Sequence, residues 1–428
     1  MRRYYEEKQG FRIDAKMKLG LEQNAFEVIP TPPAVIVFLD QHVGFPGKPL
    51  VKEGDRVLTG QKISDGEKKL TLPVHSPITG RVTGFVELRH PISGKLKHAV
   101  AIEAEGEEEW ILMKQYPNFK SLSNQEIIKR VREAGIVGLG GAAFPTYMKL
   151  SRGSDVDHLI INAKESDPNL ACDIRLVLEQ PEELINGIEI MARALEVEKV
   201  TFATRTEEGE LLQFERLLKE RGIKIAHIRP SYSIGSERLL VRELLGREVP
   251  VDQYPPDVGV VVHNVATCFA TSEAVIKGKP LISRGITFYS SKTGGRNLWV
   301  RMGTPIEHIL NYMNISSENI DRVILGSIMM GKGAPDLKTP MLKCFAGVVA
   351  LTSDEHSLYE NPSPCIRCGY CDSICPVNIY PSLLLEALEK GRTEILDSLN
   401  INSCIDCNLC SYVCPSSIRV NPKQRMMG

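Results

Sequence analysis

Short apolar segments alternate with glycine and proline in the first quarter of the chain. Four segments between residues 30 and 105 have strand character, namely Val35–Leu39, Arg56–Val57, Gly80–Phe85 and Val100–Glu103. Turn-forming residues lie between them at positions 53–55 and 77–80. Because apolar, β-branched segments bounded by glycine and proline are typical of short strands, this region predicts a small all-β domain.

Helices and strands alternate after residue 120. Ser123 and Glu126 are placed as a capping box at the start of an expected amphipathic helix, Asn124–Ala134. Strands are expected at Leu159–Asn162, Val200–Ala203 and Ile223–Ile228, with helices at Pro181–Leu195 and Leu211–Arg221 between them. A β-α-β-α-β order predicts a parallel sheet covered by helices, in which ligands bind beyond the carboxyl ends of the strands.

Two further patterns complete the chain. Residues from Arg284 to about Leu325 have the pattern of short strands around one helix, Pro305–Tyr312, which predicts a small α+β domain. The C-terminal region has helical periodicity at Pro381–Lys390 and Thr393–Leu399. We therefore expect a multidomain chain that combines a small β domain, an α/β domain, an α+β domain and a largely helical C-terminal domain.

Composition excludes several classes of protein. The 428 residues are 43% hydrophobic and 25% charged, with a formal net charge of −1, which is normal for a globular protein and gives no reason to expect nucleic acid as a partner. The longest apolar runs are far shorter than the roughly 20 residues that a transmembrane helix needs. The first eight residues include acidic side chains and lack the apolar segment of a secretory signal, so we expect a reducing, cytoplasmic location.

The cysteines carry the most specific chemical signal. The chain has 11 cysteines, an odd number that does not favour a disulfide framework. Eight of them form two copies of the C-x2-C-x2-C-x3-C-P pattern that binds [4Fe–4S] clusters. The copies are Cys365, Cys368, Cys371 and Cys375, then Cys404, Cys407, Cys410 and Cys414. Cys172, Cys268 and Cys344 stand alone among apolar neighbours and are assigned no role.

The fourth cysteine of each copy is expected to serve the other cluster. Three closely spaced thiolates surround one face of a cubane, and the turn before the proline directs the fourth away. This predicts one cluster on Cys365, Cys368, Cys371 and Cys414, and a second on Cys404, Cys407, Cys410 and Cys375. Zinc is the alternative, but zinc ribbons use two separated C-x2-C pairs, so eight thiols in duplicated runs favour iron–sulfur clusters.

Three loops near the expected strand ends are candidates for ligand binding. The GLGGAAFP segment at 138–145 is rich in small residues and suits backbone amides that approach an anion, although it lacks the GxGxxG pattern. Residues 162–168 leave one strand, and residues 232–237 follow another. Taken alone, a glycine-rich segment is as often a tight turn as a phosphate site, so both interpretations stay open here.

Four motifs in order resemble a known family. GLGGAAFPT followed by Lys149, then the loops at 162–168, at 235–237 and at 262–267, resemble the flavin and NADH loops of the complex I flavoprotein subunit. With the two cysteine runs, the chain from about residue 30 to 420 resembles the RnfC family, whose members are subunits of the Rnf electron transport complex. The segments 51–61 and 76–82 resemble biotinyl/lipoyl-type barrels but lack the modified-lysine tripeptides, which makes a carrier function unfavoured.

The resemblance implies a domain order and a set of site residues. It implies a barrel-sandwich-like β domain at 1–115, an FMN/NADH-binding Rossmann-like domain at 116–270, a β-grasp-like SLBB domain at 271–355 and a ferredoxin-like domain at 356–428. It implies that the backbone of three glycines approaches phosphates and that Lys149 supplies charge. The cofactor-binding residues would be Gly138, Gly140, Gly141, Phe144, Lys149, Asn162, Glu165, Glu237, Asn264 and Thr267.

Without the resemblance, some of these residues have ordinary interpretations. Phe144 would be a core aromatic residue, and Glu165 and Glu237 would be solvated loop acids. With it, Phe144 would stack on the nicotinamide or adenine ring, and the two glutamates would orient the nicotinamide nucleotide. Asn162, Asn264 and Thr267 would hydrogen-bond the flavin.

The implied function is electron transfer from NADH through FMN to two [4Fe–4S] clusters. A flavin is needed because a hydride carries two electrons whereas each cluster accepts one. No catalytic acid or base is assigned. The implied partners are other subunits of a membrane-bound complex and ferredoxin-type or flavin electron carriers, with the chain peripheral on the cytoplasmic face. The alternatives are a soluble accessory subunit of another reductase, of the cobalamin or proline reductase type, and a cluster-only adaptor without flavin.

Overall fold

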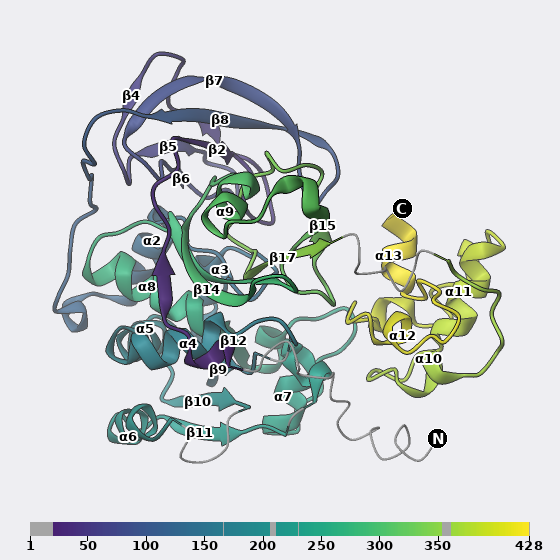
Figure 1. Ribbon diagram of the computed structural model, residues 1–428. Coiled ribbons are helices and arrows are strands. Elements are labelled where there is room, and N and C mark those ends of the chain that lie inside the picture. Colours follow the sequence, from purple (N-terminus) through teal and green to yellow (C-terminus); the bar gives the residue numbers. More distant parts are fainter. Residues whose placement is uncertain (1–19, 166, 206–210, 230, 353–360, 428) are drawn as a thin grey trace.

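The structure is a computed structural model, described for residues 20–165, 167–205, 211–229, 231–352 and 361–427. The first eight residues and Ser166 of the second loop motif lie outside this part. Figure 1 shows a β domain at the top, two α/β layers below it and a separate yellow helical module beside them. A mixed α/β multidomain fold is thereby confirmed, and the individual domain limits stay predictions.

The β domain consists of two small antiparallel sheets. The first has the order β2-β8-β7-β4, with β2 (Ala34–Phe38), β8 (Leu96–Ala104), β7 (Gly80–Arg89) and β4 (Arg56–Val57). The second has the order β3-β5-β6, with β3 (Lys48–Pro49), β5 (Lys62–Asp65) and β6 (Val74–His75). Alternate residues of the strands, such as Val35 and Val37, turn inward to one buried core, as period-2 patterning requires. All four expected strands are present.

The second domain is built on a four-stranded parallel sheet, as its β-α-β-α-β pattern predicts. The strand order is β11-β10-β9-β12, with β11 (Lys224–His227), β10 (Lys199–Thr204), β9 (His158–Ala163) and β12 (Val260–Asn264). The helices are α2 (Asn124–Glu133), α3 (Thr146–Leu150), α4 (Cys172–Glu179), α5 (Pro181–Leu195), α6 (Leu212–Glu220), α7 (Glu237–Leu245) and α8 (Val265–Ile276). The capping box at Ser123 is present, and α5 has the bounds that the sequence predicts.

Helix α8 was not expected from the sequence. Its residues, VATCFATSEAVI, have no polar face, and nine of its twelve residues are buried. A helix that is covered on most sides carries no amphipathic period, which is the signal that sequence analysis uses. Helices α4 and α7 were also missed.

Helices α5 and α8 pack so closely that one position accepts only glycine. A Cβ placed on Gly187 of α5 would lie 2.0 Å from the carbonyl oxygen of Cys268 in α8. We expect Gly187→Ala to force the two helices apart and to lower the free energy of unfolding by about 1–3 kcal/mol. Urea unfolding measures this loss. Gly333→Ala is the matched control, because no atom lies within 4 Å of its added Cβ; equal stability of the two variants would contradict the expectation.

A six-stranded sheet forms the third layer. Its order is β1-β14-β13-β17-β15-β16, with β1 (Phe26–Val28), β14 (Gly294–Arg301), β13 (Ser283–Ser290), β17 (Gly347–Thr352), β15 (Ile320–Leu325) and β16 (Lys332–Gly333). Helix α9 (Ile306–Tyr312) covers it, close to the expected Pro305–Tyr312. Strand β1 pairs in parallel with β14 across about 270 residues of sequence, a contact that no local pattern predicts.

The C-terminal module is partly helical. It contains α10 (Tyr370–Ser373), α11 (Pro381–Glu389), α12 (Leu409–Tyr412) and α13 (Pro422–Met427). The prediction of a helix at Thr393–Leu399 is wrong, because only the 3-10 turn Thr393–Ile395 forms there. The chain reverses at Asn400, which has a φ of 55°, so that Leu396 and Ile401 both enter the core of the module. Within the described residues, no helix combines the length and apolarity that a membrane crossing requires.

Candidate functional site

Two asparagines meet at the carboxyl edge of the parallel sheet. Asn162 lies in β9 and Asn264 ends β12, and the two are direct partners in the strand register. The Asn162 Nδ2 donates to the Gly235 carbonyl at 3.1 Å, and its Oδ1 accepts from the Lys164 amide at 3.0 Å. The site residues from two separate motifs are thus brought together where parallel sheets bind ligands.

Asn264 also fixes the start of helix α8. Its Oδ1 accepts from the Ala266 amide at 2.9 Å, as an N-cap residue does, and its Nδ2 donates to Asp173 Oδ2 at 2.5 Å. Asp173 lies in the first turn of α4 and was not a predicted site residue. No sequence signal identified it, because 91 residues separate it from Asn264.

The glycine loop closes on itself beside these asparagines. The Gly138 amide donates to the Phe144 carbonyl at 2.8 Å, and the Ala143 amide donates to the Gly138 carbonyl at 3.1 Å. A Cβ on Gly140 would lie 3.3 Å from the Cβ of Asn264, and Gly141 has a φ of 111° that side chains rarely adopt. Residues 140–142 are exposed, so their backbone is open to an incoming ligand.

Thr267 holds this loop from inside the protein. Its side chain is fully buried, and its Oγ1 accepts from the Leu139 amide at 2.9 Å. The loop is also held by Arg284, whose guanidinium donates to the Leu139 carbonyl at 3.2 Å. Thr267 therefore positions the glycine loop through its hydrogen bond with the Leu139 amide.

Lys149 and Glu237 form an ion pair at the edge of the site. The Lys149 Nζ lies 2.6 Å from Glu237 Oε1 and donates to the Val262 carbonyl at 3.0 Å. Burial, and next the charge of Lys149, lowers the pKa of the adjacent His263 well below its usual range, so this histidine is neutral at physiological pH. Two predicted residues 88 positions apart thus act on one another.

Glu165 is buried and is not a solvated loop acid. It accepts from the Asp173 amide at 3.0 Å and from the Ile174 amide at 3.4 Å, at the amino end of α4. Cys172 and Asp173 offer a thiol and a carboxylate beside it. Burial, and then the nearby charges of Glu165 and Asp173, raises the pKa of Cys172, which keeps this thiol protonated. Phe144 is half-buried, between the two interpretations given to it.

The C-terminal module repeats one backbone conformation twice. Arg367 and Asp406, each one residue before the second cysteine of a run, share a φ of 54°. Their amides point to the first thiol of the run, Arg367 to Cys365 Sγ and Asp406 to Cys404 Sγ, both at 3.4 Å. Amide-to-sulfur hydrogen bonds of this kind tune iron–sulfur clusters.

The four cysteines assigned to the second cluster surround one small cavity. Cys375 from the first run lines it together with Cys404, Cys407 and Cys410 from the second run. Burial raises the pKa of the Cys407 thiol to about 12. A hydrogen bond from the backbone of Leu409 lowers this pKa, and the charges of Cys375 and Cys404 raise it. Buried, crowded thiols become thiolates only with a compensating cation, so the donor set fits an iron–sulfur cluster.

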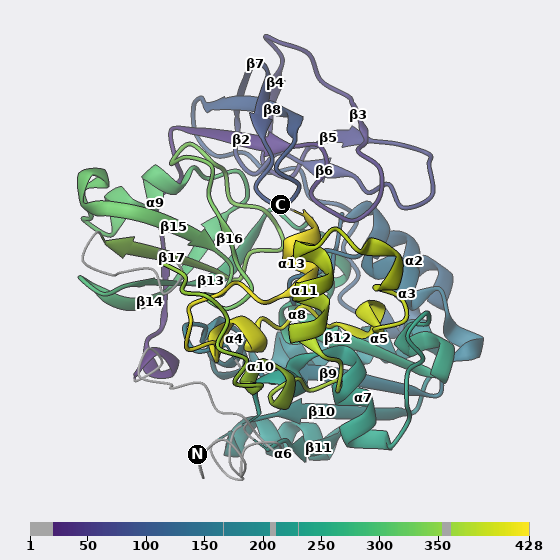
Figure 2. The ribbon, with the colours of Figure 1, turned by 90° about the vertical axis from the view of Figure 1, so that its right-hand side faces the viewer.

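The two cysteine sets differ in exposure. Cys365 and Cys368 are exposed, whereas Cys410 is buried. Cys407 packs in a core with Tyr232 and Met329, and the Asn408 Nδ2 donates to the Met329 carbonyl at 3.0 Å. Figure 2 shows the module in front of β9, β12 and α7. The set of Cys375, Cys404, Cys407 and Cys410 therefore lies toward the domain of the glycine loop, beside the 3-10 turn Tyr232–Gly235.

Three family models match the chain. The Nuo51 FMN-binding domain matches residues 131–273, the RnfC barrel sandwich hybrid domain matches residues 7–107, and the 4Fe-4S dicluster domain matches residues 364–418. The first and third of these cover the loops and the cysteine runs described above.

Curated relatives are similar over most of the chain. It is 34% identical over 367 residues to the C subunit of the proton-translocating ferredoxin:NAD(+) oxidoreductase complex of Clostridium ljungdahlii, covering 84% of this chain and 79% of the relative. It is 37% identical to the C subunit of the ion-translocating oxidoreductase complex of Rhodobacter capsulatus, covering 86% of this chain and 72% of the relative. For the Serratia proteamaculans protein of that name the identity is 34%, and the match covers 83% of this chain but about half of the relative, 51%.

A solved structure shares the fold. The chain resembles one chain of an NAD+-reducing [NiFe]-hydrogenase in the H2-reduced state, with a TM-score of 0.53 and 19% identity, covering 71% of this chain and 60% of the other. At this identity the likeness concerns the fold.

Proposed function

Because the chain belongs to the RnfC family, as its motifs predict, we propose that it oxidises NADH, or reduces NAD+, and passes electrons singly to a partner protein. Its class is that of an electron-transfer subunit with FMN and two [4Fe–4S] clusters as cofactors. Membership of the family itself indicates a subunit of an oxidoreductase complex. The NADH specificity and the identity of the electron carriers are part of the proposal.

The convergence of four loops on one sheet edge carries the proposal. The glycine loop, Asn162, Asn264 and the Lys149–Glu237 pair all lie at the carboxyl ends of β9 and β12. FMN bound there supplies the chemistry that joins a two-electron hydride donor to one-electron clusters. The chain supplies exposed backbone amides at residues 140–142, fixed carboxamides and a compensated lysine charge, which together bind and orient a phosphate-bearing ring.

The two cysteine sets define an inner and an outer position. We place the set of Cys375, Cys404, Cys407 and Cys410 toward the flavin loops, because Cys407 packs against Tyr232 and Met329. The set of Cys365, Cys368, Cys371 and Cys414 then serves the outer position, because Cys365 and Cys368 are exposed. Electron transfer between proteins requires a redox centre near the surface, and this face is where the proposed partner would bind.

The proposed setting is a membrane complex. The relatives are named as subunits of ion-translocating oxidoreductase complexes, and we propose that this chain likewise binds such subunits at the cytoplasmic face. Ferredoxin-type or flavin carriers are the proposed electron partners.

An anaerobic absorption spectrum, with iron and flavin assays before and after NADH, tests the function. We expect about eight iron atoms per chain and one FMN that bleaches when NADH is added. Full iron content without flavin, even after FMN is supplied, would leave a cluster-only adaptor in place of the dehydrogenase.

Lys149→Met tests the flavin site itself. Removing the ammonium leaves Glu237 as an uncompensated negative charge beside the place of the phosphate. We expect the FMN dissociation constant to rise by about tenfold or more, as loss of a charge-assisted contact implies. Titration of FMN with flavin-free protein, followed by FMN fluorescence, measures the dissociation constant. Lys129→Met, on the exposed face of α2, is the control; equal FMN affinity in both variants would place the phosphate elsewhere.

A further inference from the structure

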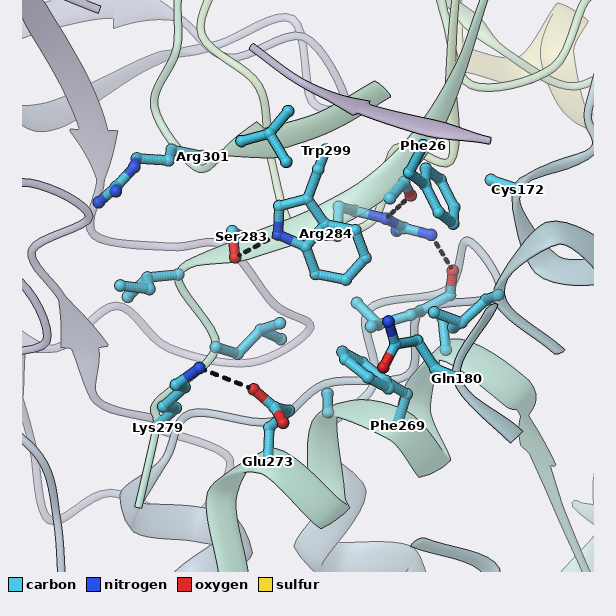
Figure 3. A pocket seen from close by; sticks show the side chains of 18 of the residues that line it. Phe26, Cys172, Gln180, Phe269, Glu273, Lys279, Ser283, Arg284, Trp299 and Arg301 are labelled. Carbon is cyan, nitrogen blue, oxygen red and sulfur yellow. Dashed lines mark hydrogen bonds and ion pairs between the residues drawn. The ribbon is translucent and has the colours of Figure 1, made fainter. Parts of the chain in front are cut away.

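A cavity of about 470 Å³ lies behind the glycine loop, whose Leu139 lines it. It is bounded by helices α4 and α8, by strands β13 and β14, and by residues of β1, as Figure 3 shows. Pockets of roughly 300–1,000 Å³ are large enough to enclose a small organic molecule. None of the residues proposed to bind the flavin or the clusters lines it.

Aromatic rings form much of its wall. Trp299 makes edge-to-face contacts with Phe26 at 5.5 Å and with Phe269 at 5.6 Å between ring centroids. Trp110 also lines the cavity, so both tryptophans of the chain border this one space. Flat aromatic walls favour a planar ligand, because rings stack or pack edge to face at close distance.

The charged side chains around the cavity are of both signs and are held by protein groups. Glu273 pairs with Lys277 at 2.7 Å and with Lys279 at 3.3 Å. The guanidinium of Arg284 donates to the backbone carbonyls of Lys343 and Leu139. The other ion pairs at the wall are Arg175–Glu179 at 2.5 Å and Arg301–Glu108 at 2.6 Å. Asp173 also lines the cavity and accepts from Asn264 Nδ2, so the charges of Arg284 and Asp173 at this wall have opposite signs and a ligand without net charge is favoured.

Gln180 and Ser283 offer neutral polar groups to a ligand. The Gln180 side chain lies at the cavity. Its side-chain carboxamide has no hydrogen-bond partner among the residues that the structure describes. The Ser283 hydroxyl accepts from Trp299 Nε1 at 3.1 Å and keeps its own proton available for donation. An amide and a hydroxyl beside aromatic walls match the carbonyl or carboxamide edge of a planar ring.

We propose that this cavity binds a small, neutral, planar ring compound that bears a carbonyl or carboxamide group. The ring lies against Trp299 and Phe269, and the polar edge pairs with Gln180. This site goes beyond the proposed electron transfer and is independent of it. It also touches Leu139 of the glycine loop, so its occupant contacts the back of the loop whose front faces the flavin site.

Benzamide titration of the holoprotein, loaded with clusters and FMN, tests the proposal by calorimetry and tryptophan emission. Benzamide is planar, neutral and carries the required edge. We expect saturable binding of benzamide, and at least tenfold weaker binding of benzoate, which is charged, and of cyclohexanecarboxamide, which is not planar. Because the two tryptophans line the cavity, their emission changes with the same dissociation constant as the heat.

Two variants locate the binding. Ala270→Phe fills the cavity from α8 and abolishes benzamide binding, and Gln180→Leu weakens it by about tenfold, the loss of one good hydrogen bond. Gln125→Leu, exposed on α2, is the matched control. If Ala270→Phe loses its cofactors, Gln180→Leu decides alone. No saturation with benzamide in the millimolar range, or equal affinity in Gln180→Leu and Gln125→Leu, overturns the proposal, while the NADH and FMN assays report on the proposed function separately.

Discussion

Cys375→Ser is expected to remove the cluster of the opposite cysteine run. Cys375 belongs to the first run in the sequence, yet it shares a cavity with Cys404, Cys407 and Cys410. Iron content should fall from about eight to about four atoms per chain, and single-electron transfer to a partner should be lost, because the inner position is vacated. NADH-dependent bleaching of FMN should persist, since the flavin loops are untouched.

The spectrum of the remaining cluster identifies which one was lost. In electron paramagnetic resonance, the reduced Cys375→Ser protein should match Cys404→Ser, and both should differ from Cys414→Ser. Cys344→Ser is the control, because Cys344 is buried outside the module and should leave the iron content unchanged. A match between Cys375→Ser and Cys365→Ser would show that each run binds its own cluster, contrary to the geometry.

Lys343→Met is expected to stabilise the protein at neutral pH. Lys343 is fully buried, and burial lowers the pKa of its ammonium from 10.5 to about 7. The Lys343 Nζ donates to the Gly135 carbonyl at 2.8 Å, just after the end of α2. A pKa shift of this size lowers the free energy of unfolding by about 5 kcal/mol at pH 7. The variant removes this cost but also loses a hydrogen bond that contributes about 1–2 kcal/mol, so its free energy of unfolding should be about 3 kcal/mol higher.

The pH dependence distinguishes this cause from better packing. Since the folded pKa of Lys343 lies below the unfolded value, the unfolded chain binds more protons between pH 7 and pH 10.5, and wild-type stability rises with pH across that window. The advantage of Lys343→Met should therefore shrink by about 1.4 kcal/mol per pH unit above pH 7. Urea midpoints at several pH values measure it. Exposed Lys338→Met is the control; a constant advantage would assign the gain to packing.

The neighbouring histidines respond to the same burial. Burial, and next the charge of Lys343, lowers the pKa of His42 to about 4 and that of His75 to about 3. Lys62 and Asp65 also act on His75, in opposite directions. These histidines stay neutral in the folded protein, so their contribution to stability is lost as pH falls below the unfolded value of 6.5. His42 and His75 come from the β domain, so this cluster forms where that domain meets residue 343.

Local sequence signals predicted the chemistry of the cysteine runs and part of the regular elements. The capping box at Ser123 and the proline at the start of α5 set helix starts within a few residues, and cysteine spacing alone indicated the crossed cluster assignment that the cage of Cys375 matches. Buried α8 gave no such signal, because its residues are apolar on nearly all sides. The segment Thr393–Leu399 was predicted as a helix from its apolar spacing, but it forms only the 3-10 turn Thr393–Ile395.

What the sequence by itself determined are features that depend on neighbours within a few positions: strand and helix periods, caps, and the thiol spacing of the cluster module. The tertiary structure alone decided which distant groups meet, as in the pairs Lys149–Glu237 and Asn264–Asp173 and in the cavity that both tryptophans line. The physical reason is that such meetings follow from how buried faces pack, and packing joins residues without regard to their separation along the chain.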